Sequence, residues 1–469
     1  MSRLHLCVSS QTPLVRFNLS YENLVRKYRA LDQPVDLPRL VEDEDYEFTA
    51  GGVTRMVFPL LKRMLQEDII VDPHWISLNP MGPEKIAADG ITLNHVQLQR
   101  SRVKGYGYAK ETMWKALHGI QKKIEHVDSL LWQDAFVDYT YYNRLCSELA
   151  MQLDKENDFD LFYVNDFQQL PMAHMLNIIK PKIFRWHIPF DEHMIPEMWK
   201  QSLSSYFNSY DVVIVSCKKY LESLKRFGYK GKAHYIYPYI EQDIYNKPSQ
   251  SEVEEFSHKF GIKEDNRVVL VVARLDPMKG QDIAIKGFAK VVKNFPDARL
   301  VVAGNGSFSS SKRGIGLSKA EMWLAKLREL VKTLGVEDRV IFTGHLTHKE
   351  LQAAYERCEA TVLPSVLEGF GLVVIESWLY KKPAIVSSMA GVAELVKHEG
   401  NGLLFNPENP DDLAKKLSIV LSNQSLASAL GKNGFKTSGQ CFIERGMKAE
   451  VQVMLDLVGR QTSRRNVFR

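Results

Sequence analysis

The sequence predicts an α/β protein built from two Rossmann-like domains. Short apolar runs rich in Val and Ile recur along the chain, and segments with helical spacing separate them. Most of these runs do not alternate with polar residues, which is typical of parallel strands buried on both faces. The length of 469 residues also exceeds what one hydrophobic core usually serves. We therefore expect one doubly wound sheet in each half.

The predicted elements follow this alternation along the chain. Strands are expected at 4–9, 160–165, 182–187, 211–216, 267–273, 299–304, 339–344, 360–364 and 383–388. Helical spacing covers 320–334 and 444–458, the second ahead of a solvated tail. Pro, Ser and charged residues without apolar periodicity at 246–255 predict a linker. The predicted division is one Rossmann-like domain at 1–248, a second at 249–443, and a C-terminal helix and tail at 444–469.

Composition and charge exclude several classes of protein. Hydrophobic residues make up 45% of the chain and charged residues 25%, as in ordinary globular proteins. The net charge of +5 is too small to indicate a nucleic-acid partner. No apolar run approaches the ~20 residues of a membrane span, and the N-terminus lacks a signal peptide's apolar core. The five scattered cysteines include no C-x-x-C pair, so we expect no disulfide framework or zinc site and a cytoplasmic location.

A first candidate ligand site is V-A-R-L-D-P-M-K-G-Q-D at 272–282. The strand ends near Arg274, a proline turn follows, and Lys279 precedes the next helix. Two cations beside free helical N–H groups suit a diphosphate. The alternative, a surface turn with solvated cations, has equal weight on this motif alone. The glycine turn A-G-N-G-S at 303–307 follows the next strand and is a weak signal by itself.

A second candidate lies in L-P-S-V-L-E-G-F-G-L-V-V-I-E-S at 363–377. A loop carries Glu368, a glycine turn follows, and a helix starting near Leu372 holds Glu376 in its first turns. The glycines Gly369 and Gly371 let backbone N–H groups face a ligand. Two carboxylates on either side of a bound phosphate would bind a sugar ring and a ribose. The alternative for Glu376 is a carboxylate that complements the helix dipole.

Together, these motifs resemble those of retaining GT-B-fold glycosyltransferases that use nucleotide sugars. The resemblance implies two Rossmann-like domains facing across a cleft, with the C-terminal helix returning to the N-terminal domain. It implies that Arg274 and Lys279 bind the donor diphosphate. Glu376 would hold the ribose and Glu368 the hydroxyls of the donor sugar. The implied phosphate- and sugar-binding backbone is that of Gly369, Phe370, Gly371 and Leu372.

Segments of the first half extend this resemblance over about residues 48 to 405. Those at 163–176, 184–196 and 113–119 are similar to segments of trehalose-6-phosphate synthases or of trehalose glycosyltransferring synthases. The loop at 48–64 looks like the glycine loop near the donor phosphates, which implies this role for Gly51 and Gly52. The resemblance further implies that His187 contacts the donor sugar, Asp166 the acceptor hydroxyls and Trp114 the acceptor pocket. The alternatives are a core histidine, a turn aspartate and a core tryptophan.

Two departures from the family's motifs leave the identity of the acceptor open. Trehalose-phosphate synthases usually begin with S-N-R, whose arginine helps to hold the acceptor phosphate, whereas this chain has Gln11 there. The segment N-D-F-Q-Q also lacks the first histidine of the family's H-D-Y-H. Glucose, glucose-6-phosphate and another hydroxyl compound all remain acceptors. Residues that would replace the arginine are Arg16, Arg102, Lys104, Arg313 and Arg328.

The sequence thus predicts retaining transfer of glucose from a nucleotide diphosphate glucose, such as UDP-glucose, to glucose-6-phosphate or glucose. The product would be trehalose-6-phosphate or trehalose, joined α,α-1,1. The alternatives are another donor sugar or acceptor, a trehalose phosphorylase, a glycosidase, and a non-catalytic sugar-nucleotide sensor. The D-x-D triplets at 43–45 and 158–160 are predicted to be solvated loops, so we expect no essential metal and no cofactor. The donor base and a homo-oligomeric state stay open.

Overall fold

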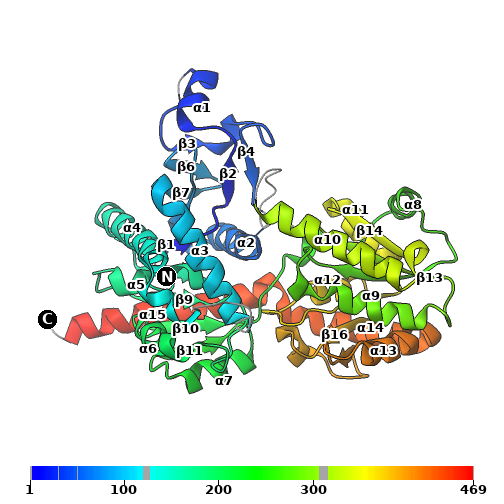
Figure 1. Cartoon of the computed structure of the whole chain (residues 1–469). Helices are drawn as coiled ribbons and strands as arrows, with labels where there is room; N and C mark the ends of the chain where they lie inside the picture. Colours follow the sequence, from blue (N-terminus) through cyan, green and yellow to red (C-terminus); the bar gives the residue numbers. More distant parts are fainter. Residues whose placement is uncertain (1–2, 30, 50, 120–126, 306–314, 468–469) are drawn as a thin grey trace. The chain divides into compact units, whose positions relative to one another are not determined.

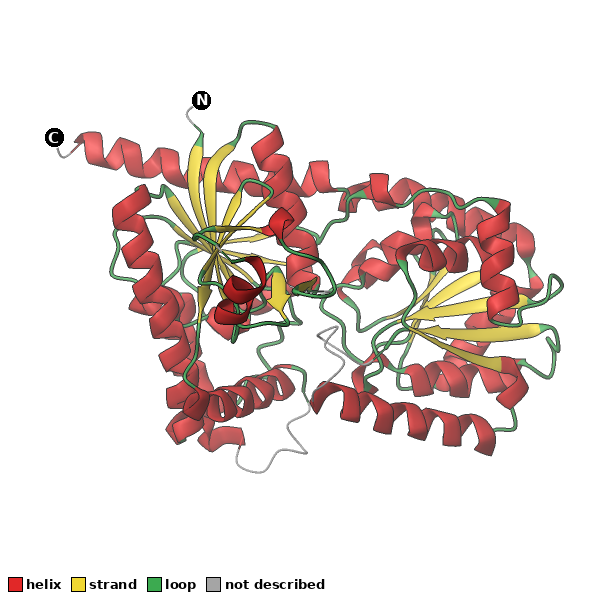
Figure 2. Cartoon of the chain, turned by 90° about the horizontal axis from the view of Figure 1, so that it is seen from above, coloured by secondary structure: helices red, strands yellow, loops and turns green. Residues whose placement is uncertain are grey.

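The computed structural model describes residues 3–29, 31–49, 51–119, 127–305 and 315–467. The chain forms two compact units: unit 1 is Met1–Ile236 with Met447–Arg469, and unit 2 is Tyr237–Gly446. Each unit contains a twisted sheet with helices on both faces (Figures 1 and 2). The predicted class, α/β with two Rossmann-like sheets, is therefore confirmed.

The described strands of unit 1 form a nine-stranded sheet in the order β11-β10-β9-β8-β1-β5-β7-β6-β3. Neighbouring strands are parallel except β6 and β7, which are antiparallel. A separate antiparallel ladder joins β2 to β4. The bounds are Leu4–Ser10 (β1), Val15–Phe17 (β2), Val35–Asp36 (β3), Tyr46–Phe48 (β4), Ile70–Leu78 (β5), Lys85–Ala88 (β6), Ile91–Val96 (β7), Leu161–Asn165 (β8), Lys182–Arg185 (β9), Val212–Val215 (β10) and Lys232–Tyr235 (β11).

Helices cover both faces of this sheet (Figure 2). The last helix, α15, returns to unit 1 from Met447 onward, as the sequence predicted. It runs on to Val467, well beyond the predicted end at residue 458. The bounds are Tyr21–Tyr28 (α1), Gly52–Gln66 (α2), Arg100–Leu117 (α3), Asp134–Asn157 (α4), Met172–Met175 (α5), Glu197–Phe207 (α6), Lys218–Phe227 (α7) and Ile443–Val467 (α15).

The described strands of unit 2 form a six-stranded, fully parallel sheet in the order β14-β13-β12-β15-β16-β17. Their bounds are Arg267–Val272 (β12), Ala298–Ala303 (β13), Val340–Gly344 (β14), Ala360–Leu363 (β15), Ala384–Ser387 (β16) and Leu403–Phe405 (β17). The helices are Gln250–Lys259 (α8), Gln281–Val291 (α9), Ile315–Thr333 (α10), His348–Arg357 (α11), Leu372–Leu379 (α12), Pro410–Ser422 (α13) and Gln424–Ser438 (α14).

The predicted linker at 246–255 is wrong, because most of it is helix α8. Ser249 accepts a hydrogen bond from the backbone of Glu252, and the Glu252 carboxylate bonds back to the Ser249 N–H. This capping box satisfies two N–H groups and starts the helix. The first boundary between the units lies after Ile236 rather than near residue 248. Ile240 explains the difference, since it is 8% exposed in a core cluster of unit 2.

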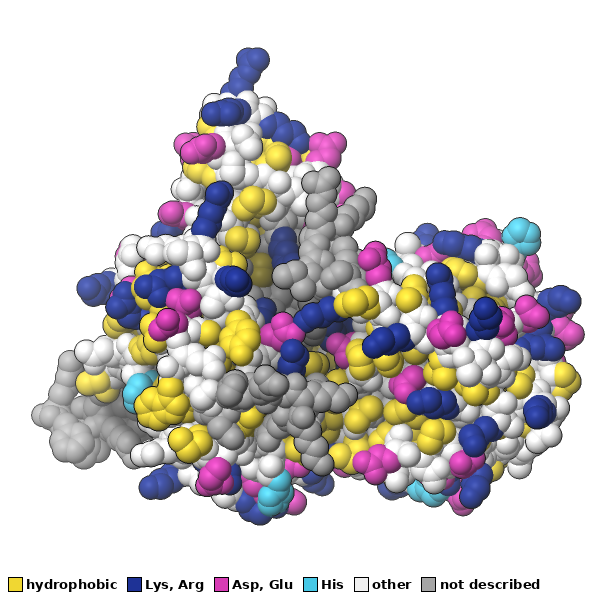
Figure 3. Space-filling model, in the orientation of Figure 1, with side chains coloured by type: hydrophobic (Ala, Val, Ile, Leu, Met, Phe, Trp, Pro, Cys, Tyr) yellow, Lys and Arg dark blue, Asp and Glu magenta, His cyan; other side chains and the backbone are white. Residues whose placement is uncertain are grey.

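Surface charge is mixed in sign. On the face shown in Figure 3, Lys and Arg side chains are interspersed with Asp and Glu side chains. None of the described helices combines the length and apolar character needed to cross a bilayer.

Candidate functional site

In unit 2, the candidate ligand residues lie at the carboxyl ends of two neighbouring strands, β12 and β15. After β12 the chain passes through Arg274 into a short 3₁₀ turn at Pro277–Lys279, where the Asp276 side chain accepts the Met278 N–H at 2.8 Å. The loop after β15 is tied to this turn, because the Val366 N–H donates to the Met278 carbonyl at 2.9 Å. Two segments distant in sequence therefore form one edge, as Rossmann topology requires of a binding site.

A glycine makes this close approach possible. Gly280 has φ 67°, and a Cβ atom there would lie 2.0 Å from the Pro364 carbonyl oxygen. A side chain at this position would clash with the loop after β15 and strain the backbone. The turn therefore brings Lys279 directly beside that loop.

Lys279 and Glu368 form an ion pair at this edge. The ammonium Nζ lies 2.6 Å from Oε2 of Glu368, and the Ser365 hydroxyl donates to the same oxygen at 3.1 Å. Both charged side chains are only partly exposed, at 21% and 17%. Burial raises the pKa of Glu368, but Lys279, Ser365 and Arg274 outweigh it, so the pKa lies below its ordinary value. Glu368 is thus a carboxylate at neutral pH.

Arg274 adds a second cation to the same edge. Burial lowers the pKa of Arg274, while the charges of Asp276 and Glu368 raise it. The Arg274 carbonyl accepts a hydrogen bond from Gln281 at 2.6 Å, and Trp323 holds that amide at 3.1 Å. The structure therefore brings Arg274, Lys279 and Glu368 together, as predicted. Arg274 and Lys279 thus supply two cations that suit a diphosphate, with the carboxylates of Asp276 and Glu368 beside them.

The glycine turn after Glu368 leads into helix α12. Gly371 has φ 109° at the N-cap, and a Cβ there would lie 2.5 Å from the Leu363 side chain. Phe370 is 4% exposed in a core cluster, so only its backbone can contact a ligand. Leu372 and the next residues provide the N–H groups that lack partners within the helix. The turn therefore presents backbone donors, with Gly369 between Glu368 and Phe370.

Glu376 is buried, and two tyrosines hold its carboxylate. Tyr245 donates to one oxygen at 2.9 Å and Tyr355 to the other at 2.6 Å. Burial raises the pKa of Tyr355 well above its ordinary value, and the Glu376 charge adds to this. Each carboxylate oxygen keeps lone pairs for a further donor. The simple helix-dipole interpretation of Glu376 therefore misses its main contacts.

In unit 1, Asp166 and His187 follow the neighbouring strands β8 and β9. The Asp166 N–H donates to the Arg185 carbonyl at 2.8 Å, which links the two strand ends. Nε2 of His187 lies 3.0 Å from Oδ1 of Asn165. Because the Asn165 amide nitrogen faces the carbonyls of Ser9 and Tyr163, the amide oxygen is the atom that faces His187.

Burial, the charge of Arg185 and the contact with Asn165 together indicate the protonation state of the His187 ring. Burial and then the charge of Arg185 lower its pKa well below the ordinary value. The ring is therefore neutral, with Nε2–H donating to Asn165 and a lone pair on Nδ1. Asn165 was not predicted as a site residue, although it directly precedes the predicted Asp166. The feature of the sequence that could have identified Asn165 is a polar residue at the end of an apolar strand.

Asp166 is strained and under-bonded, as many ligand-binding residues are. It has φ 70° and is 6% exposed. Among the described residues, its Oδ1 has no hydrogen-bond partner. Burial raises the pKa of Asp166 to about 6, although backbone groups of Phe167 and His187 and the Gln168 side chain lower it. A hydroxyl donor from a ligand would satisfy the orphaned oxygen.

The raised pKa predicts a stability effect of Asp166→Asn that depends on pH. The unfolded carboxyl releases its proton near 3.8 and the folded one near 6, so wild-type stability falls as pH rises between these values. Asparagine has no carboxyl group to ionise, so the variant does not lose stability over this pH range. We expect the variant to gain on the order of 1–3 kcal/mol at pH 7.5 and much less at pH 4.5, measured by urea unfolding. An equal effect at both pH values would contradict the burial of a charged Asp166.

Trp114 and the predicted glycine loop lie elsewhere in unit 1. Trp114, on α3, is half-buried and stacks on His118 with ring centroids 4.2 Å apart. Gly51 is the N-cap of α2, and a Cβ added there would lie 3.2 Å from the Thr12 side chain. A Cβ at Gly52 would meet no atom within 4 Å. The N-terminus of α2 is therefore open at Gly52, as a phosphate loop requires.

A buried ion pair that the sequence does not reveal lies next to β9, behind His187. Arg185 and Glu450 are both 0% exposed, with Nη1 and Oε1 3.0 Å apart. The Tyr163 hydroxyl donates to the second Glu450 oxygen at 2.5 Å, and Arg185 also donates to the Ile236 carbonyl at 2.8 Å. This network joins β8, β9 and α15 in unit 1. Its members lie so far apart in sequence that no spacing could reveal it.

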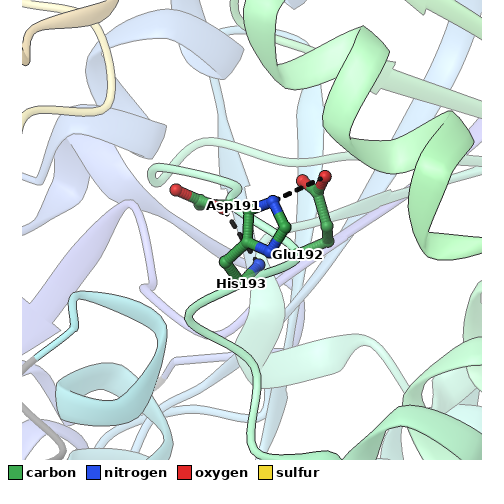
Figure 4. A group of neighbouring side chains, drawn as sticks. All are labelled: Asp191, Glu192 and His193. Atoms are coloured by element: carbon green, nitrogen blue, oxygen red, sulfur yellow. Dashed lines mark hydrogen bonds and ion pairs between the residues drawn. The ribbon is translucent and has the colours of Figure 1, made fainter.

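A possible metal-binding geometry occurs at Asp191, Glu192 and His193, whose ligand atoms lie within 4.8 Å of one another (Figure 4). Glu192 is already engaged, because Arg226 and Ser223 both donate to its carboxylate. Burial raises the pKa of Glu192, but these contacts bring it down to about 2. The group therefore consists of the ion pair of Glu192 with Arg226 and of Asp191, which accepts the His193 N–H at 2.9 Å.

Each of the two D-x-D triplets contains an aspartate that makes structural hydrogen bonds. Asp45 is fully buried and accepts hydrogen bonds from Lys27, Tyr28 and the Val41 N–H. Asp160 accepts the His5 N–H at 2.9 Å. The expectation of solvated loops is thus wrong for Asp45. The prediction that no metal is essential stays a prediction.

Two models of known families match parts of the chain. Residues 252–437 match the family of glycosyl transferases group 1, and residues 109–222 match the N-terminal domain of trehalose synthase. The mannosylfructose-phosphate synthase of Agrobacterium fabrum is 26% identical over 66% of this chain and 71% of its own length. The trehalose synthase of Thermococcus litoralis is 25% identical over 63% of this chain and 71% of its own length.

Solved structures show the same fold. A trehalose-6-phosphate synthase from E. coli bound with UDP-2-fluoro glucose has a TM-score of 0.72 and 15% identity, over 96% of this chain and 98% of that one. The chain therefore has the GT-B fold, in which each of two units contains a Rossmann-like sheet. The second half of the chain thus contains a segment that matches the group 1 glycosyl transferases, and the first half contains one that matches the N-terminal domain of trehalose synthase.

Proposed function

We propose that the protein is a retaining hexosyltransferase that moves glucose from a nucleotide diphosphate glucose to glucose-6-phosphate or glucose. The product is trehalose-6-phosphate or trehalose, joined α,α-1,1. The observation that carries the proposal is the pairing of Lys279 with Glu368 at 2.6 Å, beside Arg274 and the N-terminus of α12. It supplies cations for a diphosphate and a carboxylate for sugar hydroxyls at one strand edge.

The donor residues stabilise the leaving group. Negative charge grows on the diphosphate as the glycosidic bond breaks, and Arg274, Lys279 and the α12 backbone are held ready to receive it. Glu368 binds donor-sugar hydroxyls and Glu376 the ribose. The leaving diphosphate takes the acceptor proton, and attack from the same face retains the anomeric configuration without a covalent enzyme intermediate. Gly51 and Gly52 approach the donor phosphates.

The acceptor residues act through hydrogen bonds and shape. The unpartnered Oδ1 of Asp166 accepts an acceptor hydroxyl, and the neutral His187 offers its Nδ1 lone pair to a donor-sugar hydroxyl. Trp114 forms a wall of the acceptor pocket.

The names of the two relatives support a sugar-transfer reaction. They also leave a second candidate for the substrates. The names mannosylfructose-phosphate synthase and trehalose synthase differ in sugar and in phosphorylation. Transfer of another hexose, or to another acceptor, is therefore the second candidate. We further propose that the enzyme works without a cofactor or an essential metal. Its five free, buried cysteines suit the reducing cytoplasm.

A donor and acceptor screen tests the proposal. UDP-, ADP- and GDP-glucose are each incubated with glucose and with glucose-6-phosphate, and nucleotide release and product are followed by NMR. We expect nucleotide release that requires the acceptor, with the signals of an α,α-1,1 product. Release with a different acceptor or donor sugar would support the second candidate. Binding of the donors without turnover would overturn transfer and indicate a sensor.

A further inference from the structure

Helix α11 of unit 2 supports the carboxylate of Glu376. Tyr355, on α11, is 0% exposed and donates its hydroxyl to Oε2 of Glu376 at 2.6 Å. Tyr245 donates to the other oxygen, Oε1, at 2.9 Å. A buried carboxylate needs hydrogen-bond partners. One donor on each oxygen also fixes the orientation of the group, because rotation of the carboxylate would break both hydrogen bonds.

The face of α11 that carries Tyr355 also holds Tyr245. His348, Gln352 and Tyr355 are spaced i, i+4 and i+7, so they lie on one face of the helix. Nε2 of His348 lies 2.9 Å from the Ile244 carbonyl oxygen, and Nε2 of Gln352 donates to the same oxygen at 2.7 Å. The rings of His348 and Tyr245 pack edge to face, with centroids 5.7 Å apart. Both tyrosines on Glu376 are therefore held by one helix face.

Helix α11 is itself anchored at both ends. Thr347 and Glu350 form a capping box at its start. Glu350 also pairs with Lys259 of α8, with Nζ and Oε1 2.5 Å apart. Near the end of the helix, the Tyr355 ring stacks on the Tyr380 ring, with centroids 5.5 Å apart and 11° between their planes. The Tyr355 hydroxyl thus reaches Glu376 from a fixed direction.

The two tyrosines leave Glu376 with a defined capacity for ligand hydroxyls. A carboxylate has about four acceptor sites, two on each oxygen. Because each oxygen accepts one tyrosine hydroxyl, each keeps a site for one further donor. Two such oxygens on one fixed group match two hydroxyls on neighbouring carbon atoms, as in the 2′,3′-diol of a ribose. A 2′-deoxyribose would leave one of the two oxygens without a donor.

We propose that Tyr245 and Tyr355 are positioning residues that aim both oxygens of Glu376 at a vicinal diol, so that the site selects a ribonucleotide over a 2′-deoxyribonucleotide. This inference rests on the proposed function, in which Glu376 holds the ribose of the donor, and adds to it the class of nucleotide. The tyrosines act through Glu376. Neither the transferred sugar nor the acceptor takes part in this selection.

Calorimetric titration with nucleoside diphosphates tests the proposal without turnover. UDP, ADP and GDP are titrated into the full chain, and the one that binds best is compared with its 2′-deoxy form. We expect wild type to bind the ribonucleotide about 10- to 100-fold more tightly, as loss of one hydrogen bond to a charged group predicts. In Tyr355→Phe and in Tyr245→Phe this preference should fall several-fold. Because the preference is a ratio measured on one protein, a loss of stability alone does not change it.

Tyr380→Phe is the matched control. The Tyr380 ring stacks on Tyr355, but its hydroxyl donates to the Asn246 carbonyl at 3.0 Å and not to Glu376. This variant removes the same atom from the neighbouring ring and should keep the wild-type preference. The preference should be lost in Glu376→Gln. Adding Tyr355→Phe to Glu376→Gln should have no further effect, because the tyrosine acts through the carboxylate.

The outcomes separate this proposal from the proposed function. Equal affinity of wild type for the two nucleotide forms would overturn the selection of a ribonucleotide. A preference that stays unchanged in both tyrosine variants would leave the tyrosines a purely structural role and would overturn their assignment. If none of the three nucleoside diphosphates binds, the proposed donor site fails and the inference fails with it. A preference that depends on the tyrosines, in a protein that turns over no acceptor, would sustain the inference and overturn only the proposed transfer.

Discussion

Replacement of Lys279 by alanine is expected to lower kcat/KM for sugar transfer by about 10²–10³-fold, if the effect resembles the loss of one oxyanion-hole donor. The ammonium is fixed 2.6 Å from Glu368, so it is held in place before the diphosphate charge develops. Its removal also leaves the partly buried Glu368 without its main counter-charge. Nucleotide release with UDP-glucose and glucose-6-phosphate measures the effect.

Two controls separate charge from folding. Lys286→Ala removes a similar ammonium from α9, where it pairs with Asp282 at 2.9 Å one turn away, and should leave kcat/KM unchanged. Lys279→Arg keeps the charge and should recover part of the rate. Near-normal turnover of Lys279→Ala, in a protein that melts like wild type, would rule out the assigned role.

Replacement of Glu450 by alanine is expected to lower the free energy of unfolding by about 3–5 kcal/mol. Arg185 and Glu450 are both 0% exposed, so removal of the carboxylate leaves the guanidinium buried without its counter-ion. Tyr163 loses its acceptor at the same time. Urea unfolding measures the loss.

A double substitution tests whether the charge itself causes this loss. Arg185→Leu together with Glu450→Met removes both charges, and apolar replacements of buried pairs are often neutral or stabilising. We expect the double variant to be more stable than Glu450→Ala. The exposed pair of Arg144 and Glu148 serves as a control, and Glu148→Ala should change little. A wild-type unfolding midpoint for Glu450→Ala would contradict the uncompensated-charge argument.

The strands predicted from apolar runs are confirmed, and most of them are buried on both faces, whereas the edge strand β14 is only partly buried after Val340. β10, for example, consists of Val212–Val215, and all four residues are buried. β5 was missed because Asp72 and Pro73 interrupt its apolar run and suggest a turn. A register shift between His5 and Cys7 of β1 accommodates this irregularity. β17 was missed because three residues give no periodicity.

The donor motifs were predictable because their residues lie close together in sequence at strand ends. Sheet order then explains why Lys279 meets Glu368. The tyrosines on Glu376 were not predictable, since Tyr245 comes from a segment assigned to the other domain. Arg313 lies outside the described residues, so its predicted substitution for the missing arginine stays a prediction. The Arg185–Glu450 pair was not predictable either, because it forms only where the last helix, α15, packs in unit 1.

The stereochemistry of the first-formed product tests the central claim most directly. The enzyme is incubated with UDP-glucose, whose sugar is α-linked, and glucose-6-phosphate, and the anomeric protons are followed by NMR from the first turnovers. We predict an α-linked product that appears at the rate of UDP release. A β-linked product, or free glucose released at the same rate with and without acceptor, would contradict retaining transfer.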